Sequence, residues 1–155
     1  YAADLAIPHP TDDRTKFRLV VGGSSPAVLE LFRRIEAKVI GRQAATVREV
    51  ATLRKAEEKT GQGSLFVAPP AIDRSYMTLH EKGLKDAPKA LLQALHECRA
   101  IPFRDVWPEV LEANHITKVE LARIAWDLHR EDKIKITNLN ERQRTVKDEN
   151  TILLV

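Results

Sequence analysis

Few residues in this sequence have the types and spacing that catalysis or metal binding requires. Cys98 is the single cysteine, so the chain has no internal disulfide, and thiolate zinc sites need several cysteines. The segment His96-Glu97-Cys98 supplies too few ligands to hold a metal by itself. We therefore expect no metal site, and the lone thiol is typical of an intracellular, cytoplasmic protein. The histidines are scattered without ligand spacing: His9, His80, His96, His115 and His129.

The segment Gly22-Gly23-Ser24-Ser25 is a candidate anion site, because the N–H groups and the dipole of a helix N-terminus attract negative charge. It lacks the G-x-G-x-x-G spacing of a dinucleotide loop, and no acidic residue at the expected distance completes one. A tight turn capped by Ser25 is the favoured interpretation. No Ser/His/Asp, Cys/His or paired-carboxylate arrangement can be assembled. We therefore expect no catalytic residues, no cofactor and no enzymatic activity in this chain.

Composition is that of a globular protein with a small excess of basic residues. Of 155 residues, 43% are hydrophobic and 30% charged, and the net charge is +3. A pI of about 9.1 permits a nucleic-acid partner without requiring one. No apolar run is long enough for a membrane span, so we expect no membrane partner. The start at Tyr1 lacks the basic region of a signal peptide and suggests a fragment of a longer protein.

The first half of the chain predicts a small strand-helix-helix segment over residues 16–67, after a loose lead-in over residues 1–15. Lys16–Val21 has the aromatic and β-branched residues of a strand. Ser25 and Pro26 are typical of an N-cap and a first helical position, and one apolar stripe follows. A second, heavily charged helix is expected over Ala44–Lys59. Prolines favour a linker over residues 68–87. The stripe comprises Val28, Leu29, Phe32, Ile35 and Val39.

Residues 88–155 predict a winged helix-turn-helix domain. Helices are expected over Lys89–Arg99 and Phe103–Ala113, and a third begins after Thr117, whose spacing to Glu120 is that of a capping box. Strands are expected over residues 133–138 and 150–155, with a polar tip at residues 140–145. Three helices followed by a hairpin is the order of a winged helix. The expected fold class is therefore α+β and mostly α. The expected core comprises Leu91, Leu95, Trp107, Val110, Leu121, Ile124, Leu128, Ile134 and Leu153.

The third helix of this domain is the expected recognition element, and the leading hypothesis is binding of duplex DNA. Leu121, Ile124, Ala125 and Leu128 should point inward, which leaves basic residues on the outer face. Acidic residues such as Glu120 and Asp127 share this helix and bring it close to neutral. The expected nucleic-acid contacts are Lys118, Arg123 and Arg130 on the helix and Arg142, Arg144 and Lys147 on the wing.

A protein-interaction module is the main alternative, with Val119, Arg123 and Trp126 as the contact. The other interpretation of Trp126 is that it packs on the wing or on the N-terminal half. Three observations separate the hypotheses. A continuous basic surface over the helix and wing favours DNA. An apolar patch around an exposed Trp126 favours a protein partner. An unpaired strand edge at Lys16–Val21 favours an accessory part of a larger enzyme.

Two segments resemble three-Cys-motif partner proteins. Phe103–Ile134, with the run Phe103-Arg-Asp-Val-Trp-Pro-Glu-Val-Leu, resembles the winged helix at the C-terminus of that family. Phe17–Pro26, with Leu29-Glu-Leu-Phe32, is similar to the last strand-turn-helix of its methyltransferase-like domain. The resemblance implies a three-Cys-motif, radical-SAM-like protein as partner. It also implies an accessory, non-catalytic C-terminal part of a methyltransferase-like enzyme, since the cofactor-binding front half of a methyltransferase has no counterpart here.

Overall fold

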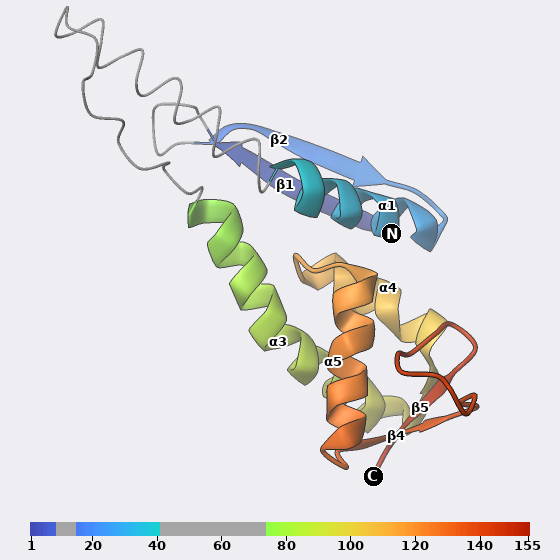
Figure 1. Cartoon of the computed structure of the whole chain (residues 1–155). Coiled ribbons are helices and arrows are strands. Elements are labelled where there is room, and N and C mark those ends of the chain that lie inside the picture. The colour runs from blue at the N-terminus through green and yellow to red at the C-terminus, as the bar shows by residue number, and fades with distance from the viewer. Residues whose placement is uncertain (9–14, 41–73) are drawn as a thin grey trace, which may run out of the picture.

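The computed structural model describes residues 1–8, 15–40 and 74–155, and its elements are labelled as in Figure 1. The chain begins with an antiparallel hairpin of β1 (Ala2–Pro8) and β2 (Thr15–Gly22). Its register pairs Leu5 with Leu19, and Ala3 and Leu5 are buried on the same face. The predicted loose lead-in is therefore wrong for residues 2–8. Pairing with β2 orders this segment, whose small side chains give little strand signal of their own.

Helix α1 (Pro26–Ile35) follows the hairpin and continues as a π-helical turn, η1 (Glu36–Ile40). Ser25 is the N-cap, as predicted, and its hydroxyl accepts a hydrogen bond from the N–H of Ala27 at 3.3 Å. Leu29 and Phe32 are buried as expected, but Ile35 is 47% exposed. Arg33 takes the buried position beside them. The side chain of Val39 and the predicted helix Ala44–Lys59 lie outside the described residues.

Helix α3 (Arg74–Cys98) corrects the predicted linker, which is helical from residue 74 onward. Pro88 lies inside this helix, although the sequence predicts a helix only from Lys89 onward, because proline cannot donate a hydrogen bond to the carbonyl four residues earlier. That carbonyl belongs to Leu84, a residue 37% exposed. Gly83 is buried where α3 crosses the turn before α5. A Cβ built there would lie 3.1 Å from the backbone nitrogen of His115, so glycine permits the close approach.

The remaining elements form helices and a small sheet. Helix α4 (Phe103–Ala113) and helix α5 (Lys118–Arg130) begin where the sequence predicts. Strands β4 (Ile134–Thr137) and β5 (Thr151–Leu154) match the predicted hairpin, and a short strand that was not predicted, β3 (Ala100–Pro102), joins them. Both pairings are antiparallel and the strand order is β3-β5-β4. The described residues thus form a mixed, mostly helical α+β structure.

Most of the predicted core is buried where α3, α4 and α5 pack together. Two members differ. Ile124 is half-buried at the edge of the core, and Leu153 is half-buried because β5 turns Ile152 inward instead. Ile152 pairs with Ile136 of β4 and Ile101 of β3, so these three side chains share a face. The predicted core residues that are buried are Leu91, Leu95, Trp107, Val110, Leu121, Leu128 and Ile134.

The hairpin and α1 lie against the end of α4 and the start of α5 (Figure 1). Arg33 makes the central contact. Its Nε donates to the carbonyl of Leu111 at 3.0 Å and its Nη2 donates to that of Glu112 at 3.2 Å. These carbonyls belong to the last turn of α4, where no helical N–H is available to them. Arg33 therefore caps α4 from a separate part of the chain.

Glu36 completes this buried contact. Its carboxylate lies 2.7 Å from Nη1 of Arg33 and 2.6 Å from Nδ1 of His115. Burial of the Glu36 carboxyl raises its pKa, but the hydrogen bonds and charges of His115 and Arg33 outweigh burial and bring the pKa below its ordinary value. The carboxylate thus stays ionised inside the junction.

Candidate nucleic-acid interface

Helix α5 has a well-defined N-terminus. The hydroxyl of Thr117 accepts a hydrogen bond from the N–H of Glu120 at 3.3 Å, and the Glu120 carboxylate accepts from the N–H of Thr117 at 2.8 Å. The predicted capping box is thereby confirmed. His80 of α3 braces the same turn: its Nδ1 donates to the carbonyl of His115 at 2.7 Å, and its Nε2 lies 3.2 Å from Glu120. The start of α5 is therefore fixed from two sides.

The outer face of α5 carries an aliphatic residue and two arginines. Val119 is 65% exposed. Arg123 and Arg130 are exposed, and neither has an ion-pair partner among residues 1–8, 15–40 and 74–155. Asp127 is exposed on the same helix. The predicted inner face of α5 is confirmed for Leu121, Ala125 and Leu128, and the predicted outer face is confirmed for Val119, Arg123 and Arg130.

Trp126 is not the solvent-exposed residue that the protein-interaction hypothesis requires. It is half-buried and packs against the core. Its ring meets that of His129 edge to face, with the centroids 5.7 Å apart. Helical spacing alone predicts an outward Trp126, whereas its ring packs partly against the core and against His129. An apolar patch centred on Trp126 is therefore missing from the described surface.

Lys118 differs most from its predicted role as a nucleic-acid contact. Its Nζ lies 2.8 Å from Asp148 and 3.6 Å from Glu30, and its side chain is only 19% exposed. The same ammonium stands 4.4 Å from the ring centroid of Trp107, a cation–π contact. Two carboxylates already neutralise it, so Lys118 holds α1, α5 and the loop before β5 together and has little charge left for a phosphate.

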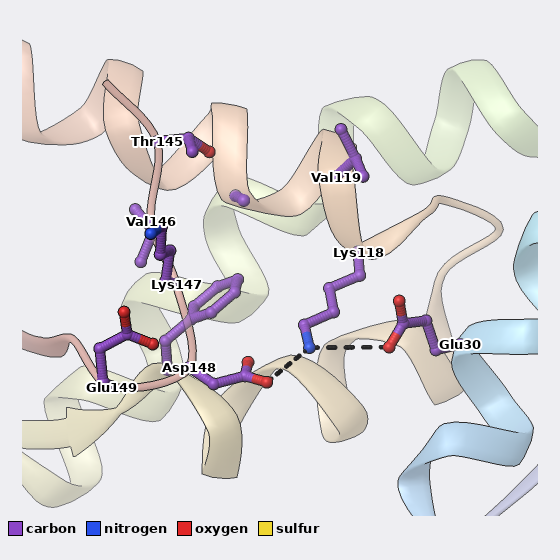
Figure 2. A pocket seen from close by; sticks show the side chains of 10 residues that line it. Glu30, Lys118, Val119, Thr145, Val146, Lys147, Asp148 and Glu149 are labelled. Carbon is purple, nitrogen blue, oxygen red and sulfur yellow. Dashed lines mark hydrogen bonds and ion pairs between the residues drawn. The ribbon is translucent and has the colours of Figure 1, made fainter. Parts of the chain in front are cut away.

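A groove of about 420 Å³ lies between the first turn of α5 and the loop before β5. Figure 2 shows the Lys118 side chain running between Glu30 on α1 and Asp148 on the loop. Val119 lies next to Lys118 on α5, on the side of the groove that faces the loop. Its floor is apolar and its rim is charged with both signs. The residues that line it include Phe103, Ala122 and Val146 on the floor and Glu30, Lys118, Lys147, Asp148 and Glu149 on the rim.

The loop between β4 and β5, residues 138–150, is organised by two buried side-chain amides that were not predicted, those of Gln143 and Asn150. Asn150 is fully buried. Its Nδ2 donates to the carbonyls of Thr137 and Asn138, and its Oδ1 accepts from the N–H of Lys147 at 2.8 Å and from Gln143 Nε2. Gln143 also donates to the carbonyl of Thr145 at 2.7 Å. The signal was an amide directly before a strand, a position that favours local side-chain to backbone bonds.

Basic residues on this loop alternate with acidic ones. Arg142, Arg144 and Lys147 are exposed, and none has an ion-pair partner among the described residues. Nη1 of Arg144 donates to the carbonyl of Gln143 at 3.4 Å. Acidic side chains on the same loop are Glu141, Asp148 and Glu149. The loop therefore offers separate cationic points and not a continuous basic surface.

The other candidate sites have simpler explanations. Gly22–Ser25 forms a turn in which the N–H of Gly23 donates to the carbonyl of Tyr1 at 3.0 Å and Ser25 caps α1. Cys98 is exposed at the end of α3. Across the part of the chain that the structure describes, no group of three His, Cys, Asp or Glu residues could hold a metal ion.

Helices in the described ranges are too short or too polar to cross a membrane. No protein-family model, curated protein or solved structure matches the chain.

Proposed function

We propose that residues 88–155, extended by the first half of α3, form a winged helix-turn-helix that binds duplex DNA and has no catalytic role. The element order α3-β3-α4-α5-β4-β5 supports this, with a three-stranded sheet beside three helices. In such a domain α5 is the recognition helix, and the loop between β4 and β5 is the wing.

One observation carries the proposal: the outer side of α5 and the wing belong to one surface. Val119 of α5 and residues 145–149 of the wing line the same groove. Arg123 and Arg130 continue from Val119 along α5, and both are exposed and unpaired within the described residues. DNA lying along α5 would therefore also meet Lys147 of the wing, and we propose that Arg142 and Arg144 of the same loop contact phosphates as well.

The cations of this surface are separate points and not the continuous basic surface expected for strong DNA binding, so we expect moderate affinity with a clear dependence on salt. Acidic residues lie between the arginines, so long-range attraction is weak. Several acids are occupied within the fold, since Glu120 caps α5, Asp148 binds Lys118, and Glu131 lies 2.7 Å from Lys133. The unpaired arginines are then free to neutralise phosphates, which releases the counterions condensed on the DNA.

Titration of the full chain with a fluorescent random-sequence duplex at several salt concentrations tests the proposal. Each lost phosphate contact should reduce the slope of log affinity against log salt by about 0.9, so Arg142→Ala with Arg144→Ala should flatten it by roughly 2 units at most. Arg34→Ala is the matched control, because Arg34 is an exposed arginine on α1 and belongs neither to α5 nor to the wing. Absence of binding at low salt would reject the proposal.

A second candidate function is docking to a methyltransferase-like or three-Cys-motif protein through β2. Among the described residues β2 pairs only with β1, so its other edge carries no strand. Leu19 and Val20, on opposite faces of β2, are 43% and 67% exposed. Apolar side chains on both faces are typical of a strand inside a larger covered sheet. Val20→Lys should abolish co-purification with a three-Cys-motif protein while leaving DNA titrations unchanged.

A further inference from the structure

The first turn of α5 directs only one of its side chains outward. Lys118 is held in the groove by Glu30 and Asp148, and Glu120 is folded back into the capping box and toward His80. Val119, between them, is 65% exposed. Both charged residues of this turn are thus used inside the protein, and its outward surface is a single aliphatic side chain. A surface that binds phosphates would instead direct its cationic side chains outward.

Arg123 lies one turn beyond Val119 on the same face, and Asp127 lies one turn beyond Arg123. Both are exposed. The stripe therefore presents an aliphatic, a cationic and an anionic side chain in successive turns. A carboxylate in this stripe would repel a phosphate, but it can accept a hydrogen bond from the amino group of cytosine. The mixed chemistry of the stripe suits the edges of bases.

We infer that Val119 and Arg123 determine base specificity, Arg123 by binding a guanine and Val119 by contacting the methyl group of a nearby thymine in the major groove. The inference rests on the proposed DNA-binding function. Arginine donates to O6 and N7 of guanine, and apolar side chains contact the C5-methyl of thymine. The two residues are separated by about 6 Å along the helix axis. At about 3.4 Å per base pair, the thymine and guanine should lie roughly two steps apart.

The rigid setting of α5 supports this readout of bases. The capping box, the His80 brace and the Lys118 ion pairs fix the first turn against α3, α1 and the wing. Base contacts discriminate only when the donor is held in register with the base edge. The wing cations then position the duplex without reading its sequence.

Selection of duplexes from a randomised pool with the full chain tests this inference. The wild-type chain should enrich sites with a thymine and a guanine about two steps apart. Replacing that guanine by 7-deazaguanine, which lacks N7, should weaken binding about tenfold, and replacing the thymine by uracil should weaken it several-fold. Arg123→Gln should lose the guanine preference and shift toward adenine, which glutamine binds through N6 and N7. Val119→Ser should lose the difference between thymine and uracil.

Arg34→Gln is the control, since it makes the same change on an exposed residue of α1 and should leave the enriched sequence unchanged. Binding that persists with no thymine or guanine preference, or with a preference that Arg123→Gln leaves intact, would overturn this inference and leave the proposed function standing. Failure to bind any duplex at low salt would overturn both.

Discussion

Arg33 and Glu36 form a buried ion pair, with Nη1 of Arg33 2.7 Å from Oε2 of Glu36 and both side chains almost inaccessible to water. The pair lies within one helical segment, but its other contacts reach across the molecule. Arg33 also binds the last carbonyls of α4, and Glu36 also contacts His115 in the turn before α5. The pair therefore fastens the N-terminal hairpin and α1 to the helices that carry the proposed DNA surface.

Removal of Arg33 should strongly destabilise the protein. Arg33→Ala leaves Glu36 buried without its guanidinium partner and leaves two carbonyls of α4 unsatisfied, so we expect a loss of about 3–5 kcal/mol in the free energy of unfolding. Urea denaturation followed by circular dichroism measures it. Arg34→Ala, the exposed neighbour, should change stability by less than about 0.5 kcal/mol. Equal stabilities for the two variants would mean that the buried pair is not formed.

The lowered pKa of Glu36 predicts a loss of stability in acid. Glu36 has a lower pKa in the folded protein than in the unfolded chain, so the unfolded state binds more protons at intermediate pH. The stabilisation is fully present above the unfolded pKa of about 4.3 and is lost as the pH falls through the lower folded value. Urea midpoints measured from neutral pH down to about pH 3 should fall for the wild-type chain and fall less steeply for Glu36→Gln. Parallel pH curves would contradict the assignment.

Local signals in the sequence predicted a large part of the fold. Helices α1 and α5 start at side-chain caps, Ser25 and Thr117, and caps are read directly from neighbouring residues. The hairpin β4–β5 and helix α4 follow from periodicity and short connections. Elements that depend on distant partners were missed or misread. Strand β1 exists through β2, β3 pairs with β5 for only three residues, and α3 continues through Pro88.

In the candidate site, too, side chains whose partners are distant in the sequence could not be predicted. Exposure of Arg123 and Arg130 follows from helical phase, and the structure agrees. The role of Lys118 could not be predicted, because its partner Glu30 lies on α1 and Asp148 on the wing. Ile152 and Leu153 are both apolar, so the sequence did not reveal which faces the core. Register with Ile136 decides this.

The two faces of α5 should respond differently to truncation. Leu121 is fully buried, so Leu121→Ala should lower the free energy of unfolding by about 2–5 kcal/mol. Ile124 is half-buried, so Ile124→Ala should lower it by less. Val119→Ala should change stability by less than about 0.5 kcal/mol, because its side chain is already in water. Thermal denaturation of the three variants gives the order. A neutral Leu121→Ala, or a costly Val119→Ala, would show that α5 faces the other way.

The wing should depend on the amide of Asn150 more than on any charged residue it carries. Asn150 uses its NH₂ group to donate to the carbonyls of Thr137 and Asn138 and its oxygen to accept from Lys147 and Gln143. Asn150→Asp has the same shape but places a second oxygen, and a negative charge, against those two carbonyls, which only accept. We expect a loss of about 2–4 kcal/mol in the free energy of unfolding near neutral pH, partly recovered when acid protonates the new carboxyl.

Asn140→Asp is the control, because Asn140 is exposed on the same loop. Hydrogen exchange should show faster exchange of the wing amides in Asn150→Asp and unchanged exchange in Asn140→Asp. Equal exchange in the two variants would mean that the wing is held by its strands alone.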